Sequence, residues 1–217
     1  MTANIQLELP PGRSFEEYIQ MFNLTAKDLA RPMIGCGDGL SSFNTRMKEL
    51  GYSVVSCDPI YRKSIPEIKS DMAANRGATI QTPRNRVEDN FWLYNNHNAV
   101  FDEFFADYEA GKREGRYLPY GLPRLPFADQ AFEIALCSHF LFTHADLGQA
   151  FHAAAIREML RVAKDARIFP LIDLQCRKPE FLEPVMAELR RQGYQAAIKK
   201  VDYGFYENGM EMMRVRL

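Results

Sequence analysis

The stretch RPMIGCGDGLSSF, residues 31–43, places three glycines at alternate positions directly after a short apolar run. A glycine-rich turn between a strand and a helix brings backbone N–H groups and a helix N-terminus close to a ligand. The stretch SSFNTRMKEL predicts the helix, closed by Gly51, and YSVVSCDP predicts a strand that ends at Asp58 and Pro59. Residues 32–58 are therefore predicted to form one βαβ unit of a parallel sheet.

Outside residues 60–116, the rest of the chain repeats this alternation of strands and helices. A helix is predicted over 14–30, where Ser14 and Glu17 have the spacing of a capping box. Further strands are predicted at 132–140, 167–174, 194–203 and 210–217, and further helices at 146–164 and 179–193. Pro170 indicates a bulge or an edge position, and the last two strands are expected to be antiparallel. The predicted fold class is α/β, with helices on both faces of a mostly parallel sheet.

Residues 60–116 interrupt the alternation and are rich in charged and aromatic side chains. A connection between parallel strands normally needs about a dozen residues plus its helix, and this one is far longer. Its clearest helix covers 101–115, with Gly111 as the predicted stop. We expect a single domain over 1–217 with an inserted helical cap at 60–116, placed over the carboxyl ends of the strands, where ligands bind in open α/β sheets.

Composition and charge narrow the classes of function. The 217 residues carry 27 basic and 28 acidic side chains, a net charge of −1, whereas proteins that track a nucleic-acid backbone usually have a basic excess. The cysteines at 36, 57, 137 and 176 form no C-x-x-C pair and are expected to be buried free thiols. Neither a secretory signal pattern nor an apolar run of about 18 residues occurs, so we expect a cytoplasmic protein with no membrane or nucleic-acid partner.

The glycines and the acid after the next strand are the first candidate ligand contacts. The spacing is G-x-G-x-G, at Gly35, Gly37 and Gly39, whereas a dinucleotide fingerprint reads G-x-G-x-x-G. The alternative to a ligand-binding loop is a glycine turn that only allows tight packing. Asp58 follows Gly39 by 19 residues, at a strand end where a carboxylate can accept both hydroxyls of a ribose. Its alternative role is an Asx turn or a helix cap ahead of Pro59.

Together with LPFADQAFEIALCSHFLF (125–142) and EMLRVAKDARIFPLIDL (158–174), these motifs resemble the class I S-adenosylmethionine (SAM) dependent methyltransferase family. The resemblance covers 33–59 and 125–217. It implies a Rossmann-like, seven-stranded sheet whose last strand is antiparallel. It also implies SAM as the cofactor, with the contacts Gly35, Cys36, Gly37, Gly39 and Pro59, the ribose on Asp58, and the adenine near the loop before Phe127.

The sequence departs from this family's pattern around the amino-acid end of SAM. Most members have an acidic residue two positions before the first glycine, where this chain has Met33, and often another near the adenine, where it has Gly121. Other groups must therefore hold the α-carboxylate and the α-amine. The candidates are Arg13, Ser14 and Tyr18 in the first helix, or Arg116 and Tyr117 after the cap, since arginine binds carboxylates through two hydrogen bonds.

Candidate catalytic residues lie where strands are predicted to end. They are His139, Asp173, Tyr203 and Ser138, the last of which is also a candidate SAM contact. His139 could deprotonate an acceptor, although a histidine at a buried strand end also serves as a structural hydrogen-bond partner. The histidines have no paired second ligand at i+4, so no metal is expected.

Three hypotheses follow from the resemblance. The first is a methyltransferase for a small-molecule acceptor bound under the cap. The second is a SAM cyclase similar to azetidine-2-carboxylate synthases, which would form azetidine-2-carboxylate and methylthioadenosine from SAM alone. Met33 favours this second hypothesis, because an α-amine that no carboxylate holds as ammonium can be neutral and nucleophilic. The third is a SAM-binding module without catalysis, which the intact glycine loop and Asp58 disfavour.

Overall fold

The computed structural model describes residues 13–75, 90–203 and 211–217. Its elements, in chain order, are α1 (Phe15–Met21), α2 (Ala26–Leu29), β1 (Met33–Cys36), α3 (Phe43–Glu49), β2 (Val54–Cys57), η1 (Pro59–Arg62), α4 (Ile65–Asn75), α5 (Asn90–Arg113), β3 (Tyr117–Leu118), β4 (Phe132–Ser138), η2 (Phe142–Leu147), α6 (Gly148–Val162), β5 (Ala163–Phe169), α7 (Leu182–Arg191), β6 (Gln195–Lys200) and β7 (Glu211–Arg216).

The seven strands form one sheet in the order β3-β2-β1-β4-β5-β7-β6. β1 pairs in parallel with β2 and β4, and β7 is antiparallel to both β5 and β6. The predicted α/β fold with an antiparallel last strand is therefore confirmed. β1, β2, β3, β4 and β5 run in the same direction, so their carboxyl ends meet at one border of the sheet, which we call the carboxyl edge.

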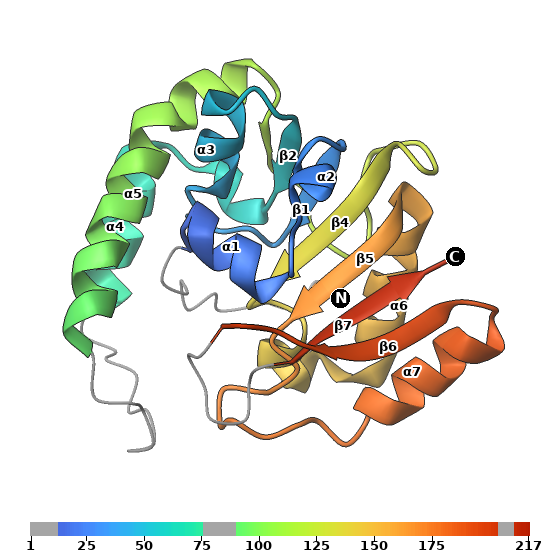
Figure 1. Ribbon diagram of the computed structural model, residues 1–217. Coiled ribbons are helices and arrows are strands. Elements are labelled where there is room, and N and C mark those ends of the chain that lie inside the picture. The colour runs from blue at the N-terminus through green and yellow to red at the C-terminus, as the bar shows by residue number, and fades with distance from the viewer. Residues whose placement is uncertain (1–12, 76–89, 204–210) are drawn as a thin grey trace.

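Helices cover both faces of the sheet (Figure 1). α6 and α7 bury one face through Ile156, Met159 and Leu189, whereas α1 and α3 bury the other through Tyr18 and Phe43. The long α5 lies beyond the β3 end of the sheet, beside α3 (Figure 1). None of the described helices is long and apolar enough to cross a membrane.

The first predicted helix is in fact two helices. α1 begins after Ser14, whose side chain forms the predicted capping box with Glu17. The chain then turns at Asn23, whose φ of 46° is left-handed, and α2 begins after Thr25 with a capping box of its own. The prediction of one helix over 14–30 is therefore wrong, because Thr25 starts a new helix within the same apolar stripe.

Strand β5 begins and ends earlier than the pattern predicts. It covers Ala163–Phe169, so the predicted start at 167 is wrong, and Pro170 follows the strand instead of interrupting it. The predicted helix over 146–164 loses its last residues to this strand, since α6 ends at Val162. The charges of Lys164 and Asp165 hide the first part of the strand from an apolar pattern.

Arg167 on β5 is fully buried and joins the sheet to the first two helices. Its guanidinium donates to the carbonyl of Phe22 at 2.9 Å and pairs with the carboxylates of Asp28 and Asp165, both at 3.0 Å. Asp165 also pairs with Arg214 of β7 at 2.5 Å. A charge can be buried in this way only because each of its donors finds an acceptor.

Residues 60–116 connect β2 to β3, which pairs in parallel with β2. Phe104 and Tyr108 of α5 are fully buried and pack with Tyr117 of β3. Gly111 does not stop the helix; it lies within α5, where a side chain would meet the ring of Tyr117 at 2.4 Å. The role of this segment as a cap over a site stays a prediction.

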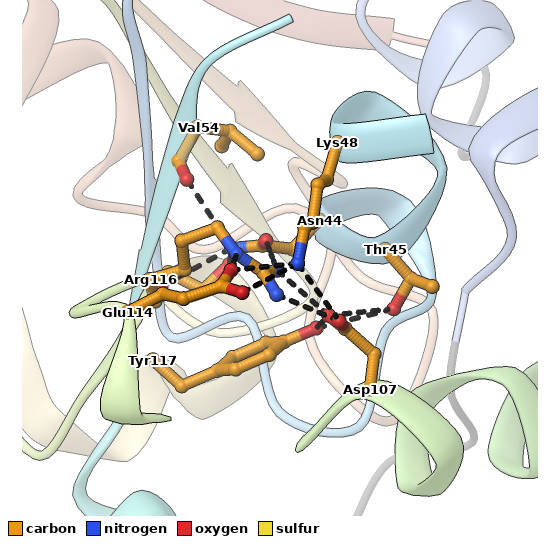
Figure 2. A network of polar contacts seen from close by, with 9 residues as sticks. Asn44, Thr45, Lys48, Val54, Asp107, Glu114, Arg116 and Tyr117 are labelled. Carbon is orange, nitrogen blue, oxygen red and sulfur yellow. Dashed lines mark hydrogen bonds and ion pairs between the residues drawn. The ribbon is translucent and has the colours of Figure 1, made fainter. Parts of the chain in front are cut away.

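Arg116, at the end of that segment, ties α5 to α3 (Figure 2). Its guanidinium donates to Asp107 of α5 at 2.6 and 2.7 Å and to Asn44 of α3 at 2.6 Å. Glu114 accepts a hydrogen bond from Arg116 and another from Lys48, each at 2.7 Å. The guanidinium is engaged in this network on three sides, so Arg116 is a structural residue and not the expected partner of a SAM carboxylate.

Candidate functional site

The glycine loop follows β1 at the carboxyl edge, and its backbone takes a conformation that residues with a side chain rarely adopt. Gly37 and Gly39 have φ values of 72° and 55°. A side chain at Gly37 would also meet the ring of Phe140 at 3.0 Å. The Gly37 N–H donates to the carbonyl of Cys57 at 2.8 Å, which holds the loop against β2. Cys36 is buried in the core, so a ligand could reach only its backbone.

Asp38, inside the glycine loop, is the candidate that sequence analysis missed. Its carboxylate folds over Gly35 so closely that a Cβ there would lie 1.8 Å from an oxygen. The residue is 7% exposed and accepts hydrogen bonds from the hydroxyls of Tyr18 at 2.8 Å and Ser56 at 2.6 Å. Burial raises the pKa of Asp38 to about 6, although both hydroxyls oppose the shift. The available signal is an acid between two loop glycines in a chain that has Met33 at the usual acidic position.

Gly35→Ala is expected to lower the free energy of unfolding by about 1–3 kcal/mol, the usual cost of overpacking a filled site. The added methyl group would displace the carboxylate of Asp38 and leave the hydroxyls of Tyr18 and Ser56 without their acceptor. Urea denaturation measures the change. In an Asp38→Ala background the methyl group meets no carboxylate, so its cost should be clearly smaller. Equal costs in the two backgrounds would contradict this explanation.

Asp58 follows β2 and touches the glycine loop. Its carboxylate oxygens accept the N–H groups of Gly39 at 3.0 Å and Ile60 at 2.9 Å. The second contact caps η1, so the structural role considered for Asp58 is present. Each oxygen keeps a lone pair for a further donor, so this role does not prevent ligand binding. Pro59 lies beside Gly121, where a Cβ would be 3.0 Å from the proline ring.

Ser138 and His139 lie at the carboxyl end of β4. His139 has a φ of 51°, is 7% exposed, and places its ring edge-on to Phe169 at 5.4 Å. Its Nδ1 is 2.9 Å from the Ser138 hydroxyl, whereas its buried Nε2 has no hydrogen-bond partner within the described ranges. Burial, and then the charge of Arg13, lower the pKa of His139 well below 6.5. The imidazole is therefore neutral at neutral pH.

The start of α1 brings two more predicted residues to the same place. Tyr18 stacks on Phe43 at 4.4 Å between ring centroids and reaches the loop with its hydroxyl. Arg13 is buried 4.0 Å from Glu17 and acts electrostatically on His139. Tyr203, which follows β6, donates to Glu17 at 2.6 Å. We call the set formed by Arg13, Glu17, Tyr18, Asp38, Ser138, His139 and Tyr203 the carboxyl-edge cluster.

Phe127 does not belong to this cluster. Its ring packs on Phe132, the first residue of β4, at 5.0 Å between centroids, and its carbonyl accepts from Arg161 at 2.7 Å. Ser138 is the last residue of the strand, whose seven residues span about 20 Å. Phe127 itself therefore lies at the opposite end of β4 from Ser138, and the adenine contact expected from the loop before it stays a prediction.

Asp173 is engaged in the turn that follows β5. Its carboxylate accepts two backbone N–H groups at 2.9 Å and pairs with the side chain of Arg177 at 3.2 Å. These contacts give Asp173 a turn-forming role, and its catalytic role stays a prediction. The same turn exposes Cys176, so the expectation of buried thiols is right for the other three cysteines only.

Comparison with solved structures gives the class of fold. Magnesium protoporphyrin IX methyltransferase from Synechocystis PCC 6803, crystallised with S-adenosylhomocysteine (SAH), matches with a TM-score of 0.50 at 11% identity, over 88% of this chain and 75% of that one. The bifunctional kinase-methyltransferase WbdD matches with a TM-score of 0.51 at 10% identity, over 93% of this chain and 38% of that one. The chain has the Rossmann-like fold of the class I methyltransferases.

A relative in sequence then places the chain in a family. It belongs to the same family as the uncharacterized protein MJ0045 of Methanocaldococcus jannaschii, to which it is 31% identical over 216 residues that cover 94% of both chains. No protein-family model matches the chain.

Proposed function

We propose that the protein is a SAM-dependent methyltransferase that acts on a small-molecule acceptor at the carboxyl edge. The observation that carries the proposal is the left-handed glycine loop joined to Asp58, whose carboxylate accepts the N–H of Gly39 at 3.0 Å. An open backbone beside an acid with spare lone pairs fits the adenosyl half of SAM. SAM supplies a sulfonium methyl group, whose transfer depends on positioning and an available nucleophile.

The carboxyl-edge cluster supplies the groups for the other half of the site. Arg13 and Tyr18 lie where α1 meets the loop and are the candidates for the amino-acid end of SAM. The buried Nε2 of His139 is available to take a proton from a hydroxyl, amine or thiol. Its neutral state at neutral pH suits this task, because a protonated imidazole could not accept a proton.

The presence of Asp38 removes the physical reason for the cyclase hypothesis. It depends on the absence of an acid at Met33, yet the carboxylate of Asp38 lies over Gly35, two residues farther along the same strand. A carboxylate near the loop favours the charged ammonium over a neutral amine. Methyl transfer is therefore the function that we propose.

The products of SAM identify the reaction. Purified protein is incubated with SAM alone and with SAM plus each of a panel of small phenols, amines and thiols, and the mixtures are separated by chromatography. SAH that forms only with an acceptor supports the proposal. Methylthioadenosine without an acceptor would identify a cyclase or lyase, and SAM binding without any product would identify a silent module; either result overturns the proposal.

Asp58→Ala is expected to weaken SAM binding by about tenfold or more, the loss of one to two charge-assisted hydrogen bonds. Isothermal titration with SAM measures the dissociation constant. Because Asp58 also caps η1, Asp58→Asn, which retains one acceptor oxygen, is measured beside it, and thermal denaturation shows whether each variant is folded. A folded variant with wild-type affinity would refute the ribose assignment.

A further inference from the structure

The hydroxyl of Tyr61, a buried residue to which the proposed function gives no role, reaches the glycine loop. Tyr61 lies in η1, directly after β2, and is 1% exposed. Its hydroxyl donates to the carbonyl of Gly39 at 2.7 Å, across 22 positions of the chain. A carbonyl oxygen can only accept, so the direction of this hydrogen bond is fixed. The contact joins the segment after β2 to the turn after β1.

Gly39 is held on both of its sides by this segment. Its N–H donates to the carboxylate of Asp58 at 3.0 Å, and its carbonyl accepts from Tyr61. The N–H belongs to the peptide plane before the Cα atom of Gly39, and the carbonyl belongs to the plane after it. The two hydrogen bonds therefore fix both backbone angles of Gly39, whose φ is 55°. A glycine without such contacts readily adopts other conformations.

The same contacts fix the carboxylate of Asp58. One of its oxygens accepts the N–H of Gly39, and the other accepts the N–H of Ile60 at the start of η1. If the backbone of Gly39 turned away, the carboxylate would lose one of these two donors and could rotate. The orientation of the lone pairs assigned to the ribose therefore depends on Gly39, and through Gly39 on Tyr61.

Aromatic side chains of α5 and β3 hold the ring of Tyr61 in place. The ring centroids of Phe104 and Tyr108 on α5 lie 6.3 and 5.9 Å from it, and that of Tyr117 on β3 lies 5.3 Å away, edge-on. Leu40, which follows the last loop glycine, belongs to the same buried cluster. A ring packed on several sides at the density of a protein core cannot swing away. The helix α5 therefore supports the glycine loop through Tyr61.

We propose that Tyr61 is a positioning residue for the SAM site, which sets the conformation of Gly39 and, through Gly39, the orientation of the Asp58 carboxylate. The inference rests on the proposed function for its ligand, whereas the contacts that carry it involve no ligand. Because the loop is ordered before SAM binds, binding does not have to supply the free energy of ordering it. The helix α5 contributes to SAM affinity through the core that it shares with Tyr61.

Tyr61→Phe tests the contact without any ligand, because phenylalanine keeps the ring and loses only the hydroxyl. Amide hydrogen exchange of the full chain, followed by NMR, reports on the Gly39 N–H, which its hydrogen bond to Asp58 protects. Exchange at Gly39 should become about three- to tenfold faster, the effect of one hydrogen bond. The amide of Ala135, on the central strand β4, reports the global opening that any loss of stability causes, and its exchange should change less.

Tyr108→Phe is the matched control for this substitution. Tyr108 is fully buried in the same cluster, but its hydroxyl donates to the carbonyl of Lys63 at 2.8 Å and not to the loop. Lys112 also donates to that carbonyl, at 3.3 Å, so the carbonyl retains a donor in the variant. Exchange at Gly39 should then change no more than exchange at the core amide. Unchanged Gly39 exchange in folded Tyr61→Phe, or an equal rise in both variants, would overturn the proposal.

A double-mutant cycle on SAM affinity tests the path through Asp58. In isothermal titration, Tyr61→Phe is expected to weaken SAM binding about three- to tenfold in the wild-type background. In the Asp58→Ala background the loss should be less than about twofold, because no carboxylate is left to orient. Tyr108→Phe should leave the dissociation constant within about twofold of wild type. If the losses from Tyr61→Phe and Asp58→Ala add, Tyr61 does not act through Asp58 and the proposal is overturned.

The two measurements distinguish a failure of this proposal from a failure of the proposed function. If the wild type does not bind SAM, the proposed function fails, and hydrogen exchange at Gly39 still decides whether Tyr61 sets the conformation of the loop. If SAM binds and the Gly39 amide does not respond to Tyr61→Phe, the proposed function stands and the positioning role of Tyr61 is refuted.

Discussion

His139→Gln is expected to lower kcat for methyl transfer by about 10²–10⁴-fold, the usual contribution of a positioned base. Glutamine has a similar size and can hydrogen-bond, but it cannot take a proton from the acceptor. The KM for SAM should change by less than about threefold, because His139 is assigned to the acceptor and not to SAM. Steady-state kinetics with an acceptor from the product assay gives both constants.

The pH dependence of the wild type supplies a second check on His139. Its pKa is lowered well below 6.5, whereas that of Asp38 is raised to about 6. Transfer needs neutral His139, so kcat should be level above pH 6.5 and fall only at the lower pH values where the imidazole becomes protonated. His144→Gln, a change in the η2 segment, is the control and should leave kcat within about twofold of wild type. Equal losses in the two histidine variants would refute the assignment.

Arg167→Met is expected to lower the free energy of unfolding by about 3–5 kcal/mol, the cost of removing one partner from a buried ion pair. Methionine fills part of the volume but leaves Asp28 and the carbonyl of Phe22 without their donor. Asp165 retains Arg214, which limits the loss on that side. Urea denaturation measures the change in unfolding free energy.

A surface pair provides the matched control for Arg167. Arg157 and Glu188 pair at 2.6 Å with side chains that are 42% and 30% exposed. Arg157→Met removes the same kind of charge, yet should cost less than about 1 kcal/mol, because water screens exposed pairs. If the two substitutions cost the same, the stabilising role of the buried network is disproved.

The sequence predicts the parts of the fold that depend on local patterns. The glycine spacing, the helix after it and Asp58 predict the βαβ unit, because a tight turn constrains residues close together in the chain. Strand β3 has two residues and forms only by pairing with β2, so no periodicity indicates it. The early start of β5 is hidden by the charges of Lys164 and Asp165, and the burial of Asp165 depends on its pairing with Arg214 of the distant β7.

The candidate site also combines residues that local patterns predict with residues that only long-range contacts bring into place. A local pattern predicts Ser138 and His139 at a strand end, and the structure has both residues there, with Arg13 acting electrostatically on His139. The role of Asp38 depends on the docking of α1 onto the loop, which places the hydroxyl of Tyr18, 20 residues earlier, on its carboxylate. A long-range contact of this kind leaves no spacing rule in the sequence.

The burial of Asp38 makes the stability of the free protein depend on pH in an unusual direction. Its pKa is about 6 in the folded chain against 3.8 for an ordinary aspartate, so between these values the folded state binds a proton more tightly than the unfolded state does. This residue therefore stabilises the fold as the pH falls through 6 toward 4, and the stabilisation is lost as the pH rises. A positively charged ligand near the loop favours the ionised form, so below about pH 6 its binding would release a proton to the solvent.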